Sequence, residues 1–229
     1  MRTIGLLGGM SWESTAEYYR LANELVRDQL GGLHSAKILM HSVDFAEIEA
    51  MQVEGRWDDA GTVLAEAAGR LQAAGADLVV LCTNTMHKVA GPIEAAISVP
   101  FVHLGDTTAD AVKAAGLSRV GLLGTIFTME QDFYVDRLRS HGLDVVLPGP
   151  DDRQLVSEII YEELCLGVVR DESRAIYLDV IERLRAEGAQ GVILGCTEIE
   201  LLVDQSHVAT PVFPTTLLHV QAAVKLALE

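Results

Sequence analysis

Two cysteine–threonine pairs are the residues whose type and setting best suit chemistry. Cys82-Thr83 follows the apolar run Val79-Val80-Leu81, and Cys196-Thr197 follows Val192-Ile193-Leu194-Gly195. Ligands of open parallel sheets lie at the carboxyl ends of the strands, so both thiols are expected at such an end. If the thiols oppose each other across one ligand, a thiolate can remove a proton from one face of a carbon. The other thiol can then return a proton to the opposite face, which inverts the configuration.

The alternative for each cysteine is a structural role, because buried cysteines usually act as small hydrophobes. We favour that role for Cys165, which lies in the helical run 159–166 and has no repeat partner. A free thiol has a pKa of about 8.5, too high for a ready base at neutral pH. The helix starts expected near Met86 and Ile199 offer backbone N–H groups that could stabilise a thiolate or a carboxylate. Asn84 and Thr85 could add neutral donors to such a site, or simply cap the helix.

An internal repeat supports the pairing of the two cysteines. Five features recur in the same order at a nearly constant sequence offset. Such a series is hard to explain by chance. The features are Gly-Leu-Leu-Gly at 5–8 and 121–124, Arg-Leu at 70–71 and 183–184, the strands 79–81 and 192–194, the two Cys-Thr pairs, and Pro100 and Pro211. The repeat indicates two similar halves, each with a Cys-Thr just past an equivalent strand.

Short apolar runs alternate with amphipathic stretches along the whole chain. The predicted strands are residues 3–7, 37–41, 77–81, 100–103, 119–123, 143–147, 191–194 and 211–213. Residues 57–74 have helical periodicity, and Asp151 and Asp152 are expected to cap another helix. This alternation predicts an α/β fold of parallel sheets covered by helices. We expect a first domain of residues 1–103 plus 215–229, where the last helix returns, and a second domain of residues 104–214.

Composition excludes several classes of function. The chain has 229 residues, 49% of them hydrophobic, and 17 basic against 33 acidic side chains give a net charge of −16. Such a chain has no electrostatic footprint for nucleic acid or anionic membrane, and its longest apolar runs are far too short to span one. Three cysteines, with no signal-peptide pattern, indicate a reducing cytoplasm without structural disulfides.

Other motifs are missing or ambiguous. No C-x-x-C or H-E-x-x-H is present and the seven histidines are scattered, so we expect no metal site. The loop of residues 8–15 lacks both dinucleotide and Walker patterns, although Ser11 or Ser14 could cap a helix there. The G-x-S-x-G motif that would indicate a serine hydrolase is absent from the sequence. His87, five residues after Cys82, could tune the thiol or serve only as a cap or surface residue.

Three segments resemble the aspartate/glutamate racemase family: Leu-Gly-Gly-Met-Ser-Trp-Glu-Ser-Thr at 7–15, Cys-Thr-Asn-Thr-Met-His-Lys at 82–88, and Gly-Cys-Thr-Glu-Ile at 195–199. The resemblance spans nearly the whole chain. It implies two pseudo-symmetric Rossmann- or flavodoxin-like α/β domains with the active site between them, a homodimer, and no pyridoxal phosphate, metal or other cofactor. It also implies Cys82 and Cys196 as the two acid/base residues.

The resemblance further implies residues around the substrate. Those expected at its carboxylate are Met10, Thr83, Asn84, Thr85, Thr125 and Thr197, with Gln52 near the ligand. Glu198 stands where related glutamate racemases have a histidine, which makes it a candidate to tune the thiol. By the same analogy, Cys196 acts on the L-enantiomer and Cys82 on the D-enantiomer.

The expected activity is interconversion of L- and D-aspartate or glutamate. The sequence departs from the family pattern at one point. Some dicarboxylate-specific relatives carry a lysine in the segment after Glu163-Leu164, but this chain has no lysine between Lys113 and Lys225. Arg56, Arg170 or Arg174 could substitute. A broad-specificity amino-acid racemase therefore remains open, as does a related isomerase, decarboxylase or hydantoin racemase. A two-lobed small-ligand binding protein is the non-enzymatic alternative, and the missing C-x-x-C disfavours a thiol redox protein.

Overall fold

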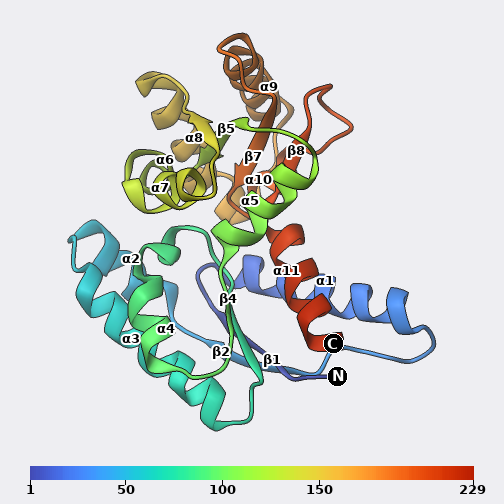
Figure 1. The fold of residues 1–229 in the computed structure, drawn as a ribbon. Helices are drawn as coiled ribbons and strands as arrows, with labels where there is room; N and C mark the ends of the chain where they lie inside the picture. The colour runs from blue at the N-terminus through green and yellow to red at the C-terminus, as the bar shows by residue number, and fades with distance from the viewer. The chain divides into compact units, whose positions relative to one another are not determined.

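The apolar runs form eight strands in two parallel sheets (Figure 1). The structure, a computed structural model, describes all residues from Met1 to Glu229. The first sheet has the order β2-β1-β3-β4 and contains β1 (Ile4–Gly8), β2 (Ile38–Ser42), β3 (Leu78–Leu81) and β4 (Phe101–Val102). The second has the order β6-β5-β7-β8 and contains β5 (Arg119–Gly124), β6 (Asp144–Val146), β7 (Gly191–Gly195) and β8 (Val212–Pro214). All eight predicted strands are present, and the α/β prediction is confirmed.

The chain divides into two compact units, each built on one sheet. Unit 1 comprises Met1–His103 and His219–Glu229, and unit 2 comprises Leu104–Leu218. The helices of unit 1 are α1 (Trp12–Leu30), α2 (Phe45–Val53), α3 (Trp57–Ala73), the 3-10 helix η1 (Thr85–Val89), α4 (Ala90–Ala96) and most of α11 (Thr215–Leu228). Those of unit 2 are α5 (Leu104–Ala114), α6 (Ile126–Glu130), α7 (Asp132–Ser140), α8 (Pro150–Glu162), the 3-10 helix η2 (Leu164–Leu166), α9 (Asp171–Ala186) and α10 (Ile199–Leu202).

Each sheet is buried on both faces, as its continuous apolar strands require. In unit 1, α3 and η1 pack on one face with α2 and α4, while α1 and α11 cover the other (Figure 1). In unit 2, α8 and α9 cover one face and α5 and α7 the other. Removal of this apolar surface from water is the main source of stability for each unit.

Matching glycines allow the same close packing in both units. A Cβ on Gly5 would lie 2.8 Å from the Ala76 Cβ and 3.5 Å from the Leu71 Cβ, and one on Gly121 would lie 2.9 Å from Leu184 Cδ1. Leu71 and Leu184 are the two leucines of the repeated Arg-Leu pair. The helix before the third strand of each unit therefore lies against a glycine of the first strand, where a larger side chain would collide.

The two helix caps that the sequence analysis considered at Ser11 or Ser14 and at Asp151 and Asp152 had different outcomes. The Ser11 hydroxyl accepts a bond from the Ser14 N–H at the start of α1, which identifies Ser11 as the cap. Helix α8, however, begins at Pro150 with Gly149 in the cap position, so the prediction that Asp151 and Asp152 form the cap was wrong. Proline is favoured at the first helical position, and Pro150 starts the helix before the two aspartates. Both carboxylates then lie in the first turn, where the helix dipole stabilises them.

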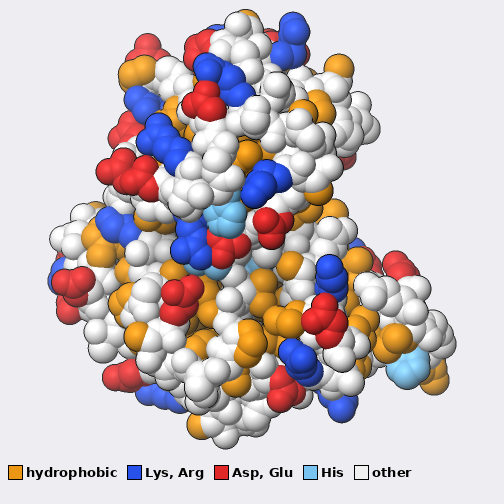
Figure 2. Space-filling model, viewed as in Figure 1, with side chains coloured by type: hydrophobic (Ala, Val, Ile, Leu, Met, Phe, Trp, Pro, Cys, Tyr) orange, Lys and Arg blue, Asp and Glu red, His pale blue; other side chains and the backbone are white.

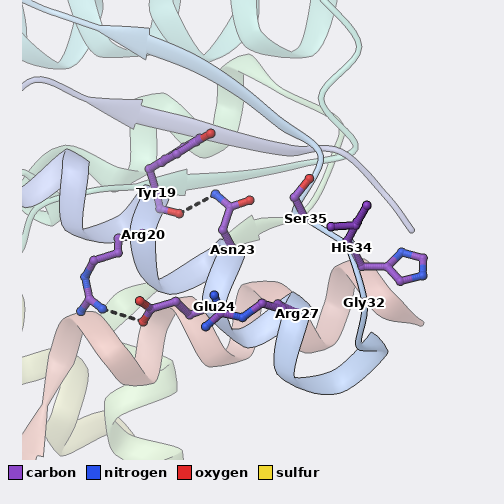
Figure 3. A pocket seen from close by; sticks show the side chains of 9 residues that line it. Tyr19, Arg20, Asn23, Glu24, Arg27, Gly32, His34 and Ser35 are labelled. Atoms are coloured by element: carbon purple, nitrogen blue, oxygen red, sulfur yellow. Dashed lines mark hydrogen bonds and ion pairs between the residues drawn. The ribbon is translucent and has the colours of Figure 1, made fainter.

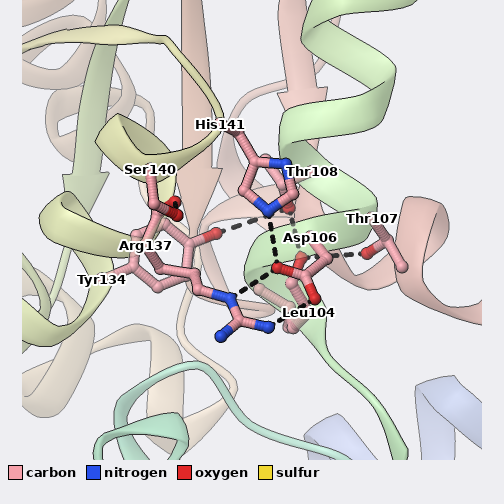
Figure 4. Close-up of polar contacts among 8 residues, drawn as sticks. All are labelled: Leu104, Asp106, Thr107, Thr108, Tyr134, Arg137, Ser140 and His141. Atoms are coloured by element: carbon pink, nitrogen blue, oxygen red, sulfur yellow. Dashed lines mark hydrogen bonds and ion pairs between the residues drawn. The ribbon is translucent and has the colours of Figure 1, made fainter.

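An ionic cluster ties α5 to α7 within unit 2 (Figure 4). The guanidinium of Arg137 donates two bonds of 2.6 Å to the Asp106 carboxylate, and His141 Nε2 lies 2.8 Å from the same carboxylate. All three side chains are partly exposed, so this pairing contributes only on the order of 1 kcal/mol.

The surface mixes charges of both signs. Figure 2 shows basic and acidic side chains intermingled in small groups. No helix is both long enough and apolar enough to cross a bilayer.

Candidate active site

Cys82 lies immediately after β3 and is held by the neighbouring elements. Its backbone N–H donates to the Leu7 carbonyl of β1 at 2.9 Å, which extends the parallel ladder by one bond. Its carbonyl accepts a bond of 3.1 Å from the Ser14 hydroxyl, in the first turn of α1. The thiol is fully buried, and its nearest polar partner is the Val80 carbonyl at 3.8 Å. The strand end and α1 together fix the backbone from which this thiol projects.

The Cys82 thiol is protonated at neutral pH. Burial raises its pKa well above the ordinary value, because a thiolate would lose its hydration. The helix start that follows Cys82 does not stabilise the thiolate enough to offset the effect of burial on the pKa. The next element is η1, a 3-10 helix of only five residues. Cys82 therefore needs a ligand or a neighbouring charge before it can act as a base.

Cys196 occupies the matching position after β7, with a different partner. Its Sγ–H donates to Glu198 Oε2 at 2.9 Å, and both side chains are buried. Burial raises the pKa of Cys196 well above the ordinary value, and the Glu198 carboxylate raises it further. The Glu198 carboxylate thus favours the protonated form of this thiol. The two thiols are thus chemically unequal, since no carboxylate contributes to the pKa of Cys82.

The loops next to the two cysteines come from adjacent strands. In unit 1, Leu7 pairs with Leu81, so Gly8 and Cys82 leave the sheet side by side. In unit 2, Gly124 pairs with Gly195, so Thr125 and Cys196 do the same. The Thr125 hydroxyl caps α6 by accepting from the Thr128 N–H, as Ser11 caps α1. Each unit therefore brings together a capped helix start and a cysteine at the carboxyl edge of its sheet.

The other predicted site residues of unit 1 lie on the elements around Cys82. Those that are buried there are Met10, Gln52, Thr83, Asn84 and Thr85. Gln52 reaches across from α2, and its Nε2 lies 2.9 Å from Met86 Sδ. The amide therefore has a defined position next to the turn that carries Cys82.

In unit 2, Thr197 is held by the start of α11. The Thr216 hydroxyl donates to the Thr197 hydroxyl at 3.1 Å, and the Thr216 N–H donates to Glu200 at 3.0 Å. The Thr215 hydroxyl donates to the Leu194 carbonyl at 2.8 Å, one residue before the strand ends. Three polar groups at one helix start thus fix the turn that carries Cys196.

The third cysteine lies outside the single helical run that the sequence analysis gave it. Cys165 lies in η2, after α8 has ended, rather than within one continuous helix. It is partly buried against the core formed by α8, α9 and β7. It has no equivalent in unit 1, where the repeat places only Cys82.

Every arginine considered for a second substrate carboxylate is paired with an acidic residue. Arg56 bonds Glu54 and Asp59, Arg170 bonds Glu163 at 3.0 Å, and Arg174 bonds Asp171. The described residues contain no group of three His, Cys, Asp or Glu side chains suited to a metal ion.

A surface pocket of about 450 Å³ lies elsewhere in unit 1 (Figure 3). The end of α1 and the loop after it line the pocket, including Tyr19, Arg20, Asn23 and His34. None of the predicted site residues lines it.

The structure groups three histidines that the sequence does not connect: His87 and His219 are buried, and His103 is partly buried. The rings of His87 and His103 have centroids 4.7 Å apart, and those of His87 and His219 are 5.7 Å apart. His87 Nδ1 lies 2.7 Å from the Thr83 carbonyl, directly beside Cys82. The three come from η1, the end of β4 and α11, so no sequence spacing could have grouped them.

Known proteins match this chain over nearly its whole length. A sequence profile of the Asp/Glu/hydantoin racemase family matches residues 7–223. A proposed Asp/Glu racemase from Yersinia pestis is 53% identical, with a TM-score of 0.94 and coverage of 100% of both chains. An aspartate racemase homologue from Pyrococcus horikoshii OT3 is 34% identical, with a TM-score of 0.89 and the same coverage. The broad specificity amino-acid racemase RacX of Bacillus subtilis (strain 168) is 21% identical, covering 93% of this chain and 92% of that one. The chain belongs to the Asp/Glu/hydantoin racemase family.

Proposed function

We propose that the protein racemises a free amino acid, aspartate or glutamate, without a cofactor, by two-base proton transfer between Cys82 and Cys196. The observation that carries the proposal is the equivalent placement of two buried, free cysteines after β3 and β7 of two identically ordered sheets. Small-ligand binding alone would not require a thiol at each of these positions. Membership of the racemase family supports the same chemistry.

In the proposed reaction, one cysteine thiolate takes the α-proton and leaves a planar carbanion. The other cysteine thiol donates its proton to the opposite face, so the product has inverted configuration and the two sulfurs have exchanged protonation states. Both thiols are protonated in the free protein, so one proton must first pass to solvent. The ammonium group of the substrate favours this loss, because a nearby positive charge stabilises a thiolate.

The carbanion needs stabilisation that no cofactor supplies. Its charge spreads onto the substrate carboxylate, so donors fixed around that carboxylate lower the barrier most. We assign this role to the polar side chains beside the two cysteines: Thr83, Asn84, Thr85, Thr125 and Thr197. Met10 and Gln52 would shape the same site from unit 1.

A broad-specificity racemase is the second candidate. It is favoured by the pairing of Arg56, Arg170 and Arg174 with acidic residues, which leaves none of the three uncommitted for a side-chain carboxylate. The RacX relative carries the same description. A panel of acidic and neutral amino acids separates the two candidates directly.

The test is α-proton exchange followed by proton NMR in deuterated water. Wild-type protein should exchange the α-proton of its substrate and produce the other enantiomer with no added cofactor. Cys82→Ser and Cys196→Ser should each abolish racemisation, since acid–base groups contribute roughly 10²–10⁴-fold. Each should keep slow exchange of the one enantiomer that its remaining thiolate can deprotonate. Cys165→Ser is the matched control and should behave as wild type. Full racemisation by either single-cysteine variant would refute the two-base scheme.

A further inference from the structure

Two histidines of this group, His87 and His219, have defined tautomers, because each has one ring nitrogen facing a backbone carbonyl. His87 Nδ1 faces the Thr83 carbonyl at 2.7 Å, and a carbonyl cannot donate, so Nδ1 carries the proton. His219 Nε2 faces the Val102 carbonyl at 2.6 Å and carries its proton for the same reason. In neutral His219 the other ring nitrogen then accepts from the Tyr18 hydroxyl at 2.9 Å. Each imidazole is thus held as one tautomer.

The environment keeps these rings neutral. Burial lowers the pKa of His87 well below the ordinary value, and the neighbouring His103 and His219 lower it further. Burial also lowers the pKa of His219 to about 4. At neutral pH His87 and His219 are therefore uncharged, and each directs its N–H at a backbone carbonyl.

The Cys82 backbone is held by Leu7 and Ser14, but the Thr83 carbonyl that follows it lies outside the strand ladder and is held by His87. Strand bonds end at the Cys82 N–H, and the next residues turn through a Thr83 N–H to Leu81 carbonyl bond of 2.9 Å. The helix η1 that follows has no side-chain cap. In unit 2 the corresponding turn is held by the hydroxyl of Thr216 on Thr197. In unit 1 the equivalent anchor is an imidazole.

On the basis of the proposed function, we infer that His87 is a positioning residue for Cys82. Its imidazole N–H fixes the Thr83 carbonyl, and the rings of His103 and His219 fix the imidazole. His103 precedes the link into α5, and His219 follows the return into unit 1, so both covalent connections between the units carry a ring of this group. The His87 bond therefore supports the half of the reaction that uses Cys82, and leaves the half that uses Cys196 unaffected.

The test compares His87→Leu with His87→Asn in single-cysteine backgrounds. Leucine removes the donor, whereas asparagine has a side-chain N–H near the position of Nδ1. In the Cys196→Ser background, His87→Leu should slow α-proton exchange by about 10–100-fold, the cost of a misplaced catalytic group. His87→Asn should restore most of that rate. In the Cys82→Ser background, neither change should matter. His141→Asn, at a polar contact within unit 2, is the control.

Two measurements keep the inference separate from the proposed function. Iodoacetamide labelling of Cys82, followed by peptide mass spectrometry, needs no substrate; His87→Leu should change its rate while that of Cys196 stays constant. In the wild-type protein, ¹⁵N NMR at pH 7 should show His87 as the Nδ1–H tautomer. Absence of exchange in the wild type would refute the racemase proposal alone. Three results would overturn the positioning role. The first is unchanged Cys82 labelling and unchanged exchange in His87→Leu, and the second is an equal loss of exchange rate in the Cys82→Ser and Cys196→Ser backgrounds. The third is an Nε2–H tautomer of His87 in the wild-type protein.

Discussion

The buried histidines make the stability of the protein depend on pH in a predictable direction. In the folded state burial lowers the pKa of His219 to about 4, against an ordinary value of 6.5. The unfolded chain therefore binds a proton that the folded chain rejects, and the free energy of unfolding falls as the pH drops below 6.5. The loss continues until the pH reaches about 4, where the folded protein is protonated as well.

The magnitude follows from the two pKa values. Their difference of about 2.5 corresponds to a maximum loss of about 3.4 kcal/mol, of which about 2 kcal/mol is reached at pH 5. The neighbouring rings of His87 and His103 also affect how the free energy of unfolding depends on pH. The pKa of His87 is lowered as well, so its protonation adds a loss of the same sign. Tyr18 is the remaining titratable neighbour, and its hydroxyl lies 2.9 Å from His219 Nδ1.

The assay is urea unfolding at pH 7.5 and at pH 5, at constant ionic strength, for the wild type and for His219→Gln. Glutamine cannot titrate but still offers one donor and one acceptor. Effects of carboxylates are common to both proteins and cancel in the comparison. Between the two pH values, the wild type should lose about 2 kcal/mol more than His219→Gln. The exposed His34 provides the control, because His34→Gln should follow the wild type. The reasoning fails if wild type and His219→Gln show parallel pH dependence.

Two further predictions address the active-site side of each sheet. Glu198→Gln removes a negative charge beside Cys196 and keeps an acceptor, so the pKa of Cys196 should fall; the pH dependence of its alkylation measures this, and an unchanged or higher pKa would contradict the assigned contact. Gly8→Ala places a Cβ 2.3 Å from Thr15 Cγ2 and should destabilise the protein by about 1–3 kcal/mol in urea unfolding. Gly69→Ala in α3, where a Cβ meets nothing within 4 Å, should instead stabilise by about 0.5–1 kcal/mol; equal effects of the two changes would count against the packing argument.

The strands and the cysteine positions were predictable because their causes are local. Runs such as Leu78–Leu81 are apolar throughout, and a buried parallel strand needs that pattern whatever surrounds it. The repeat also predicts that Cys82 and Cys196 lie at equivalent strand ends. Local chemistry also explains the one misplaced cap, since Pro150 competes with Asp151 for the start of α8.

The electrostatic state of the site was not predictable in the same way. The sequence shows that a helix follows each cysteine, but not that these helices are too short for a strong dipole, with five residues in η1 and four in α10. Nor does it show how deeply each thiol is buried, and burial decides both pKa shifts. The histidine group depends on contacts between distant segments, because His87 and His219 meet only after α11 has packed on the first sheet.

One hydrogen bond between the two ends of the chain gives the fold a property of its own. The Arg2 N–H donates to the Ala227 carbonyl at 2.8 Å, so the first and last residues of unit 1 are neighbours. The two ends of the chain are therefore close enough to be joined by a short linker. A short linker from Glu229 to Met1, with a new opening at the exposed turn of Gly116, gives a circular permutant that begins with β5. The gene order of the two halves is then reversed while every strand keeps its neighbours. We therefore expect the permutant to form the same two sheets, because the strand order within each sheet does not depend on which half comes first in the chain.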